Sequence, residues 1–206
     1  MRRFLILAHK VPTGGQFTLN DLAGGGGRVD EIARAVSTGF LLSNDLRRDT
    51  EITVVFASER PPGPRRVRLL GDRIRHLNPD ERSTAALLKN ALVRAIPAEH
   101  DVESSPGLLV GPVVPEQEIE AFAALPGAFW LTEEGQPLDD SLGLPDGFAA
   151  ILGDPYGPSP GEQALLEQLR LPKVSLGPRS MRVSQCIDVL HNDFDRRAAR
   201  RGPALP

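Results

Sequence analysis

Short apolar runs alternate with segments of helical periodicity over most of the chain. Residues 4–8 (FLILA) and 52–57 (ITVVFA) have the nearly uninterrupted apolar character of buried strands. A helix is expected from residue 29, because apolar side chains recur there at the spacing of one helical face: Val29, Ile32, Ala33, Val36 and Phe40. The first part of the chain is therefore predicted to form a strand, a long loop, an amphipathic helix and a second strand.

The second half of the chain repeats this alternation in shorter units. Further strands are expected at residues 108–110, 128–131, 148–152 and 174–176, and further helices at 116–125, at 162–169 and from about 182. Strands that alternate with helices predict an α/β fold with a mostly parallel sheet and helices on both faces. No repeat and no long linker divides the chain, so we expect one domain over residues 1–199 and a mobile tail over residues 200–206.

Two glycine-containing segments predict turns. Gly71-Asp72 lies between short runs at 66–70 and 73–76, and this arrangement predicts a hairpin. The run Gly24–Gly27 lacks the third glycine of a G-x-G-x-x-G motif, where Val29 stands, so it does not match a dinucleotide-binding loop. We interpret the run either as a flexible segment that orders around a partner or as a turn that needs a positive φ.

Two further segments carry helix-start signals. Asn78 and Glu81 match an N-cap and a capping-box acid, and they predict a helix that runs to about residue 96. Residues 157–161 (GPSPG) match the hydrolase string G-x-S-x-G, but Pro160 has no backbone N–H to contribute to an oxyanion hole. Ser159 is therefore interpreted as the N-cap of the next helix, with Pro160 at its first position.

Composition narrows the class of protein. With 206 residues, of which 40% are hydrophobic, the chain is long enough to fold around its own core. The single cysteine allows no internal disulfide, and the four scattered histidines provide no metal-ligand spacing, so we expect a reducing compartment and no metal. The apolar run 4–8 is too short for a signal peptide or a membrane span. We therefore expect a soluble, cytoplasmic protein without a membrane partner.

The charge is more informative in its distribution than in its sum. A formal net charge of −3 argues against a polybasic nucleic-acid binder. However, 21 of the 24 basic residues are arginines, and they gather near residues 47–48, 65–75 and 196–201. Arginine binds phosphate in a bidentate manner and stacks on bases, which favours an RNA partner. The alternative is a GC-rich genome that encodes arginine in place of lysine.

Two C-terminal segments share one pattern, in which a short apolar strand ends in a glycine and an irregular loop, and a helix follows. They are residues 148–157 (FAAILGDPYG) and 174–181 (VSLGPRSM). Ligands in open α/β sheets bind beyond the carboxyl ends of strands, where glycine allows a close approach. On this physical basis we predict a small-molecule pocket. Cys186 stands on the apolar side of the last predicted helix, with Val183, Ile187 and Leu190, and is interpreted as a packing residue.

At these segments the sequence resembles the SPOUT-class, S-adenosylmethionine-dependent methyltransferases of the TrmY type, which modify N1 of pseudouridine in the T loop of tRNA. The resemblance covers nearly the whole chain, in seven segments that occur in the same order. They are FTLNDL with GRVDEIARAV (17–36), FLLSNDLRRDTEITVVF (40–56), LNPDERSTAALLKNAL (77–92), SSPGLLV (104–110), ILGDPYG (151–157), SLGPRSM (175–181) and QCIDVLHNDFDRR (185–197).

The resemblance implies a SPOUT fold in which the C-terminal loops and the last helix thread a trefoil knot. It also implies S-adenosylmethionine as cofactor, tRNA as partner, and a homodimer whose interface uses the last helix. Carried over position by position, it implies these cofactor contacts: Leu131, Gly153, Leu176, Gly177, Pro178, Arg179, Ser180, Met181 and Cys186.

Three departures from the family pattern bear on function. The glycine run 24–27 replaces a less uniform stretch, Asn44-Asp45 stands where His-Gly is usual, and Arg179 occupies a variable loop position. The first two fall on the presumed substrate side. The implied activity is N1-methylation of pseudouridine at position 54 of tRNA. The alternatives are a SPOUT enzyme that acts on another RNA, such as a ribosomal pseudouridine, and a non-catalytic RNA-binding protein with the same fold.

Methyl transfer to N1 requires that its proton be removed or that the resulting anion be stabilised. The candidates for a general base are Asp30, Asp80 and Glu81, and Arg28 and Arg47 are candidates for binding RNA or stabilising the anion. Two of these acids also have a structural interpretation. Glu81 is explained as part of a helix cap, and Asp30 lies in a first helical turn, where acids interact favourably with the helix dipole.

Overall fold

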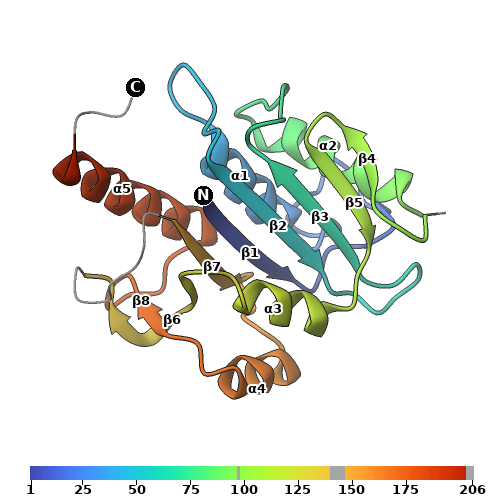
Figure 1. Ribbon diagram of the computed structural model, residues 1–206. Coiled ribbons are helices and arrows are strands. Elements are labelled where there is room, and N and C mark those ends of the chain that lie inside the picture. The colour runs from blue at the N-terminus through green and yellow to red at the C-terminus, as the bar shows by residue number, and fades with distance from the viewer. Residues whose placement is uncertain (97, 140–146, 203–206) are drawn as a thin grey trace.

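A computed structural model describes residues 1–96, 98–139 and 147–202. Within these residues, eight strands form a single sheet (Figure 1): β1 (Arg2–Ala8), β2 (Thr50–Phe56), β3 (Arg65–Leu70), β4 (Val102–Ser105), β5 (Leu108–Pro112), β6 (Ala128–Pro137), β7 (Phe148–Gly153) and β8 (Lys173–Ser175). Five helices are described: α1 (Val29–Phe40), α2 (Glu81–Arg94), α3 (Pro115–Ala123), α4 (Pro160–Gln168) and α5 (Val183–Arg201). The expected tail begins inside α5, and its residues 203–206 lie outside the described residues.

The sheet is mixed but mostly parallel, as the alternation of strands and helices predicts. Its order is β4-β5-β3-β2-β1-β7-β6-β8. The central strand β1 pairs in parallel with β2 and β7, and β6 pairs in parallel with β7 and β8. Only β3 and β4 run against the others, through antiparallel ladders with their neighbours. The carboxyl ends of β1, β6, β7 and β8 consequently lie at one edge of the sheet.

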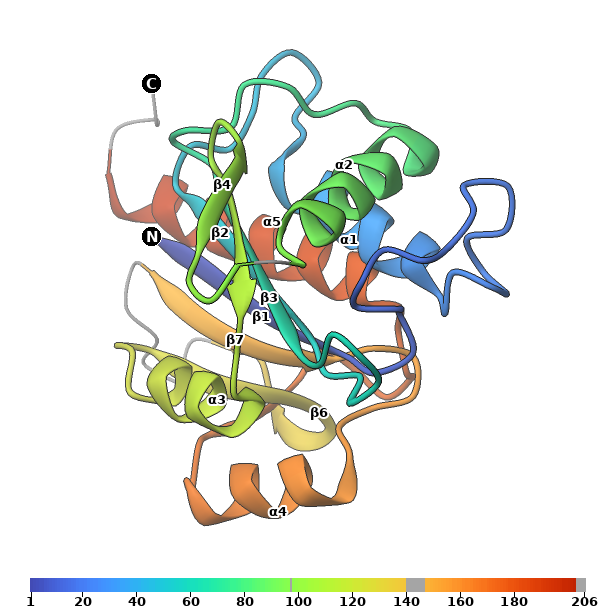
Figure 2. The same cartoon turned by 90° about the vertical axis from the view of Figure 1, so that its right-hand side faces the viewer.

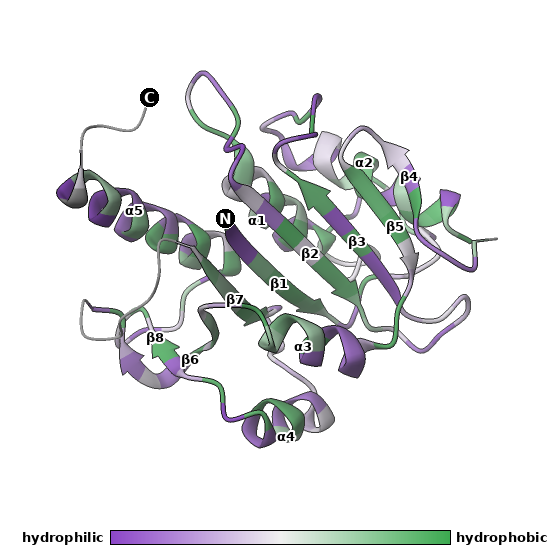
Figure 3. Cartoon of the chain, in the orientation of Figure 1, coloured by the Kyte–Doolittle hydropathy of each residue, from purple (hydrophilic) through white to green (hydrophobic). Residues whose placement is uncertain are grey.

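Helices cover both faces of the sheet (Figure 2). Side chains alternate between faces along a strand, so Phe4 and Ile6 pack with α1, α2 and α5, whereas Leu5 and Leu7 pack with α3 and α4. The central strands are hydrophobic over most of their length, apart from the arginines that begin β1, and hydrophilic residues concentrate on the outer side of α5 and on loops (Figure 3). The core therefore consists of two layers that share the central strands.

A buried polar cluster ties α5 to the start of β1. The guanidinium of Arg2 donates to Asp195 at 2.6 Å, and Arg47 donates to the same carboxylate at 2.7 Å. Nδ1 of His191 lies 3.1 Å from Nη1 of Arg2, and Nε2 of His191 lies 3.1 Å from the carbonyl oxygen of Gly39. Burial, together with the charges of Arg47 and Arg2, lowers the pKa of His191 to about 3. The imidazole is therefore neutral, with Nδ1 accepting from Arg2 and Nε2 donating to Gly39.

The predicted hairpin around Gly71-Asp72 is wrong. After β3 the chain forms a turn, in which the N–H groups of Arg73 and Ile74 both donate to the carbonyl of Leu70. The antiparallel partners of β3 are β2 and β5, and β5 begins 38 residues after β3 ends, at residue 108 against residue 70. Gly71 packs closely against the backbone at Arg47, where a Cβ on residue 71 would collide with the carbonyl oxygen. Glycine is therefore needed at this position because two backbone segments pack closely there, and not because the chain forms a two-residue hairpin loop.

The helix caps confirm one prediction and correct another. Ser159 caps α4 and forms a full capping box with Glu162, with Pro160 at the first helical position, as predicted. The cap of α2 is Asp80 and not Asn78, because the Asp80 carboxylate accepts from the N–H of Ser83 at 2.8 Å. The helix therefore begins two residues later than the sequence signal indicated. The edge strand β4 was not predicted, since its sequence, VESS, is largely polar.

Candidate functional site

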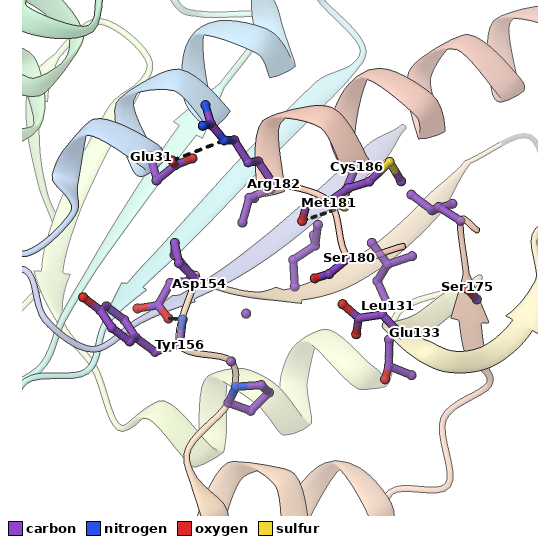
Figure 4. Close-up of a pocket in the computed structure, with 18 of the residues that line it drawn as sticks. Glu31, Leu131, Glu133, Asp154, Tyr156, Ser175, Ser180, Met181, Arg182 and Cys186 are labelled. Carbon is purple, nitrogen blue, oxygen red and sulfur yellow. Dashed lines mark hydrogen bonds and ion pairs between the residues drawn. The ribbon is translucent and has the colours of Figure 1, made fainter. Parts of the chain in front are cut away.

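A cavity of about 590 Å³ opens at the carboxyl ends of β7 and β8, beside the middle of β6 (Figure 4). Its volume is in the range of small-molecule sites, and its place beyond the ends of parallel strands is where α/β sheets bind ligands. It is lined by residues from the middle of β6, the ends of β7 and β8, the loops after β7 and β8, and the starts of α1 and α5: Arg28, Glu31, Trp130, Leu131, Thr132, Glu133, Leu152, Gly153, Asp154, Pro155, Tyr156, Gly157, Pro158, Ser175, Leu176, Gly177, Arg179, Ser180, Met181, Arg182, Val183 and Cys186.

The loop after β7 is fixed by Asp154. The N–H of Asp154 donates to the carbonyl of Leu7 at 2.9 Å, which joins the loop to the end of β1. The Asp154 carboxylate accepts from the N–H of His9 at 2.9 Å and from the N–H of Tyr156 at 2.8 Å. A Cβ at Gly153 would lie 2.9 Å from the Cα of Gly157, so the tight fold of this loop requires glycine.

The loop after β8 turns at Gly177. The Ser175 hydroxyl donates to the carbonyl of Gly177 at 3.1 Å and lies 3.3 Å from its N–H. Gly177 has a φ of +148°, which side chains rarely tolerate, and a Cβ there would meet nothing within 4 Å. The glycine therefore serves the backbone conformation and leaves open space beside the chain.

One end of the cavity is apolar. Leu131 from β6 and Leu176, Met181 and Cys186 from the C-terminal segment form its wall, and Figure 4 shows Leu131 and Cys186 on the side away from Tyr156. Burial, and then the nearby carboxylate of Glu133, raise the pKa of the Cys186 thiol to about 11. The thiol is therefore protonated at neutral pH and contributes an apolar surface, not a nucleophile.

An irregularity in β6 carries Glu133 to the cavity. The pairing of β6 with β8 shifts register, so that Leu131 and Gln136 both face Val174. Gly135 permits this, because a Cβ there would collide with the backbone of Val174. The hydroxyl of Ser180 donates a hydrogen bond to Glu133 and lowers the pKa of its carboxyl. An ionised carboxylate thus lies beside the apolar wall.

The opposite side of the cavity carries a buried carboxylate among arginines. Only 3% of the Glu31 side chain is exposed. Its carboxylate lies 2.6 Å from Nη2 of Arg28, 3.1 Å from Arg34 and 3.9 Å from Nε of Arg182. Arg28 precedes α1 with a φ of 69°, an unusual conformation for a residue with a side chain. Two cations that line the cavity, Arg28 and Arg182, are thereby held by one anion.

A charged histidine, His9, contacts the loop after β7 and the first turn of α4. Nε2 of His9 lies 2.7 Å from Glu162, and Nδ1 lies 3.6 Å from Asp154. The carboxylates of Asp154 and Glu162 raise the pKa of His9 to about 9, against the opposing effect of its burial. His9 is therefore an imidazolium at neutral pH, and it links the end of β1 to the cavity loop and to the first turn of α4.

The structure brings the predicted cofactor residues together. Eight of the nine line the cavity, although they come from positions 131 to 186 of the chain. The ninth, Pro178, lies between lining residues of the same loop but does not itself line the cavity. The glycine loops and the family resemblance thus indicated residues that the fold gathers around one cavity, and cofactor binding by them stays a prediction.

The predicted RNA-binding arginines lie in different surroundings. Arg28 lines the cavity and donates to Asp30 at 3.0 Å. Arg47 does not line it, because its guanidinium binds Asp195 and only 15% of its side chain is exposed. Although burial opposes the effect, the hydrogen bond and charge of Arg28 lower the pKa of Asp30. Asp30 therefore lies next to a cavity residue but is held as a carboxylate by an ion pair.

The other two candidate bases lie outside the cavity. Asp80 serves as the N-cap of α2, where contacts with Ser83 lower the pKa of its carboxyl. The carboxylate of Glu81 accepts from Arg34 at 2.6 Å. Both acids are thus accounted for by local structure, Asp80 by the cap that was assigned to Asn78 and Glu81 by an ion pair between α1 and α2.

Sequence reasoning missed seven polar residues of the cavity: Glu31, Thr132, Glu133, Asp154, Tyr156, Ser175 and Arg182. Asp154 and Tyr156 stand inside the segment ILGDPYG that it singled out, so that signal could have found them. Glu31 is adjacent to Asp30 in the first turn of α1, where an acidic residue is expected for its interaction with the helix dipole and gives no separate signal of a site. Glu133 and Arg182 had no local signal, because a register shift and a helix start carry them to the cavity.

The described ranges 1–96, 98–139 and 147–202 contain neither a metal-binding cluster nor a membrane-spanning helix. No group of three or more His, Cys, Asp or Glu side chains there is arranged to hold a metal ion. None of the helices described in those ranges is both long and apolar enough to cross a membrane.

Comparisons with known proteins agree with this geometry. Residues 1–199 match the family described as "Putative SAM-dependent RNA methyltransferase". The chain is 38% identical to the tRNA (pseudouridine(54)-N(1))-methyltransferase of Methanocella arvoryzae, over 96% of this chain and 100% of that relative. It is 36% identical to the protein of the same name from Haloferax volcanii, over 95% of this chain and 96% of that relative. Among solved structures, Archaeoglobus fulgidus Nep1 bound to S-adenosylhomocysteine superposes with a TM-score of 0.63 at 13% identity, covering 96% of this chain and 99% of that one, which shows a shared fold. The chain therefore belongs to the SAM-dependent RNA methyltransferase family that includes the archaeal tRNA (pseudouridine(54)-N(1))-methyltransferases.

Proposed function

We propose that this protein transfers the methyl group of S-adenosylmethionine to N1 of pseudouridine 54 in tRNA. The observation that carries the proposal is the match to pseudouridine methyltransferases over nearly the full length of both chains. The cavity supports it independently, because it lies where α/β sheets bind ligands and has an apolar end and a charged end.

The residues of the cavity fit the proposed cofactor. The adenine ring is flat, and its faces can pack against the apolar wall of Leu131, Leu176 and Met181. The carboxylate of Glu133 is ionised and can pair with a cationic group of the cofactor. Gly177 leaves open space beside the loop. When bound, S-adenosylmethionine supplies an activated methyl group on a sulfonium, so the protein has only to align the acceptor and manage its proton.

The charged end of the cavity fits the acceptor. Arg28 and Arg182 place two positive charges there, and the anion of N1 is stabilised by such charges as its proton leaves. Asp30 is the only one of the three candidate bases that contacts a residue of the cavity, through Arg28. Its low pKa makes it a weak base, so we assign the main catalytic contribution to the arginines and a positioning role to Asp30.

We also propose the remaining features that the family resemblance implies. The segment from β7 to α5 threads a trefoil knot, the methyltransferase domain spans residues 1–199, and two copies associate through α5 in the cytoplasm. Sedimentation equilibrium tests the association, since a mass close to 22.3 kDa would contradict the homodimer. A truncation after residue 199 that loses its cooperative unfolding transition would contradict the domain boundary.

Calorimetry and methyl transfer test the proposed function. Protein treated with EDTA should bind S-adenosylmethionine and should methylate a tRNA that carries pseudouridine 54 but not the same tRNA with uridine 54. Mass spectrometry of the digested nucleosides should identify N1-methylpseudouridine. Absence of cofactor binding at millimolar concentration would overturn the enzyme assignment. Methylation of ribosomal RNA in preference to tRNA would show that the substrate is ribosomal RNA and not tRNA.

A further inference from the structure

Tyr156 is an exposed aromatic side chain at the cavity. It lines the cavity from the loop after β7, yet 59% of it is exposed. Among the large hydrophobic and aromatic side chains of the described residues, it is the most exposed. Core packing therefore does not explain the ring, and aromatic side chains are typical of the lining of ligand pockets.

The backbone that carries this ring is held in a defined place, although the ring itself is not buried. The N–H of Tyr156 donates to the carboxylate of Asp154 at 2.8 Å, and the N–H of Gly157 donates to the carbonyl of Asp154 at 2.9 Å. Asp154 is in turn bonded to the end of β1 through Leu7 and His9. A preformed position of this kind lowers the entropic cost of binding a partner on the ring.

The surroundings of the ring select the chemistry of that partner. Nζ of Lys10 lies 5.5 Å from the ring centroid, and Arg28 lines the same cavity. Figure 4 shows Tyr156 and Asp154 on the side of the cavity away from Leu131 and Glu133, which we assign to the cofactor. An open ring flanked by cations is suited to a flat base whose neighbouring phosphates are negative.

We propose that Tyr156 is the platform on which the target nucleobase stacks when it enters the cavity. The inference rests on the proposed function, because it assumes an RNA substrate at the charged end. An enzyme that acts on a base inside a folded loop must take that base out of its stack, and an aromatic side chain replaces the lost stacking. Tyr156 offers such a surface directly next to the cofactor cavity.

The experiment compares Tyr156→Ala, Tyr156→Phe and a matched control, Val114→Ala. Val114 is similarly exposed, at 50%, and precedes α3, outside the residues that line the cavity. We expect Tyr156→Ala to lower kcat/KM for tRNA by about 5- to 100-fold, the range that loss of one base–aromatic stack produces. Tyr156→Phe and Val114→Ala should stay within about twofold of the wild type, and the affinity for S-adenosylmethionine should be unchanged in all three variants.

A second measurement does not depend on activity. A T-arm RNA with 5-iodouridine at the target position should cross-link to the wild-type protein on irradiation, and peptide mapping should place the link on Tyr156. If Tyr156→Ala matches Val114→Ala in an active enzyme, or if the cross-link maps elsewhere, the stacking role is wrong. If Tyr156→Ala instead weakens cofactor binding, the ring belongs to the cofactor site. If the wild type itself does not methylate tRNA, the proposed function fails and the inference with it.

Discussion

The His9 ion pairs make the stability of this protein depend on pH in the alkaline range. His9 contacts Asp154 and Glu162 only in the folded chain, so its pKa rises from an ordinary value of 6.5 to about 9 on folding. A group whose pKa is raised on folding stabilises the folded state fully below the unfolded pKa, and that contribution is lost as the pH rises through the folded pKa. The affected window is therefore pH 6.5 to about 9.5.

The magnitude follows from the two pKa values. Between pH 7 and pH 10 the folded protein releases the His9 proton that the unfolded chain has already lost for the most part. Integrating this difference gives a loss of about 2.5 kcal/mol in the free energy of unfolding. His9→Gln removes the titrating group, so the variant should be less stable than the wild type at pH 7 and nearly equal to it at pH 10.

Urea unfolding of both proteins at pH 7, 8, 9 and 10 measures this difference. Groups that titrate in both proteins, such as the Cys186 thiol, cancel when the variant is subtracted from the wild type. His100→Gln, at an exposed position, is the control and should follow the wild type at every pH. Parallel pH profiles for the wild type and His9→Gln would show that the ion pairs with Asp154 and Glu162 do not act as described.

Three further predictions follow from particular contacts. Gly153→Val should abolish S-adenosylmethionine binding measured by calorimetry, because the valine side chain would collide with the loop at Gly157. Ser159→Ala should lower the free energy of unfolding by about 1 kcal/mol through loss of a helix cap and should leave binding intact. Equal binding by the two variants would refute the cavity assignment. Arg28→Ala should lower tRNA affinity and reduce the slope of log affinity against log salt by about one, while Arg47→Ala should leave the slope unchanged; the reverse result would move the RNA surface to Arg47. Asp195→Asn should lower the free energy of unfolding by about 2 kcal/mol, between the values for exposed and buried ion pairs, because Arg2 and Arg47 lose a shared carboxylate that is about one third exposed. A urea midpoint equal to that of the wild type would contradict this.

Local features of the fold were determined by the sequence alone. Apolar runs at 4–8 and 148–152 correspond to β1 and β7, and the helical spacing from Val29 corresponds to α1. The cap at Ser159 was identified correctly as well. These features depend on backbone sterics and on neighbours a few residues apart, so a short window of sequence contains the information that decides them.

The tertiary structure alone decided which polar groups meet. Arg47 and Asp195 are 148 residues apart, and their pairing turned a candidate RNA contact into part of a buried cluster. Glu133 reaches the cavity only through the register shift between β6 and β8. Glu31 gathers Arg28 and Arg182 from two helix starts. An ion pair requires only opposite charges at close range, so its partners are chosen by how the sheet brings distant segments together and not by any pattern along the chain.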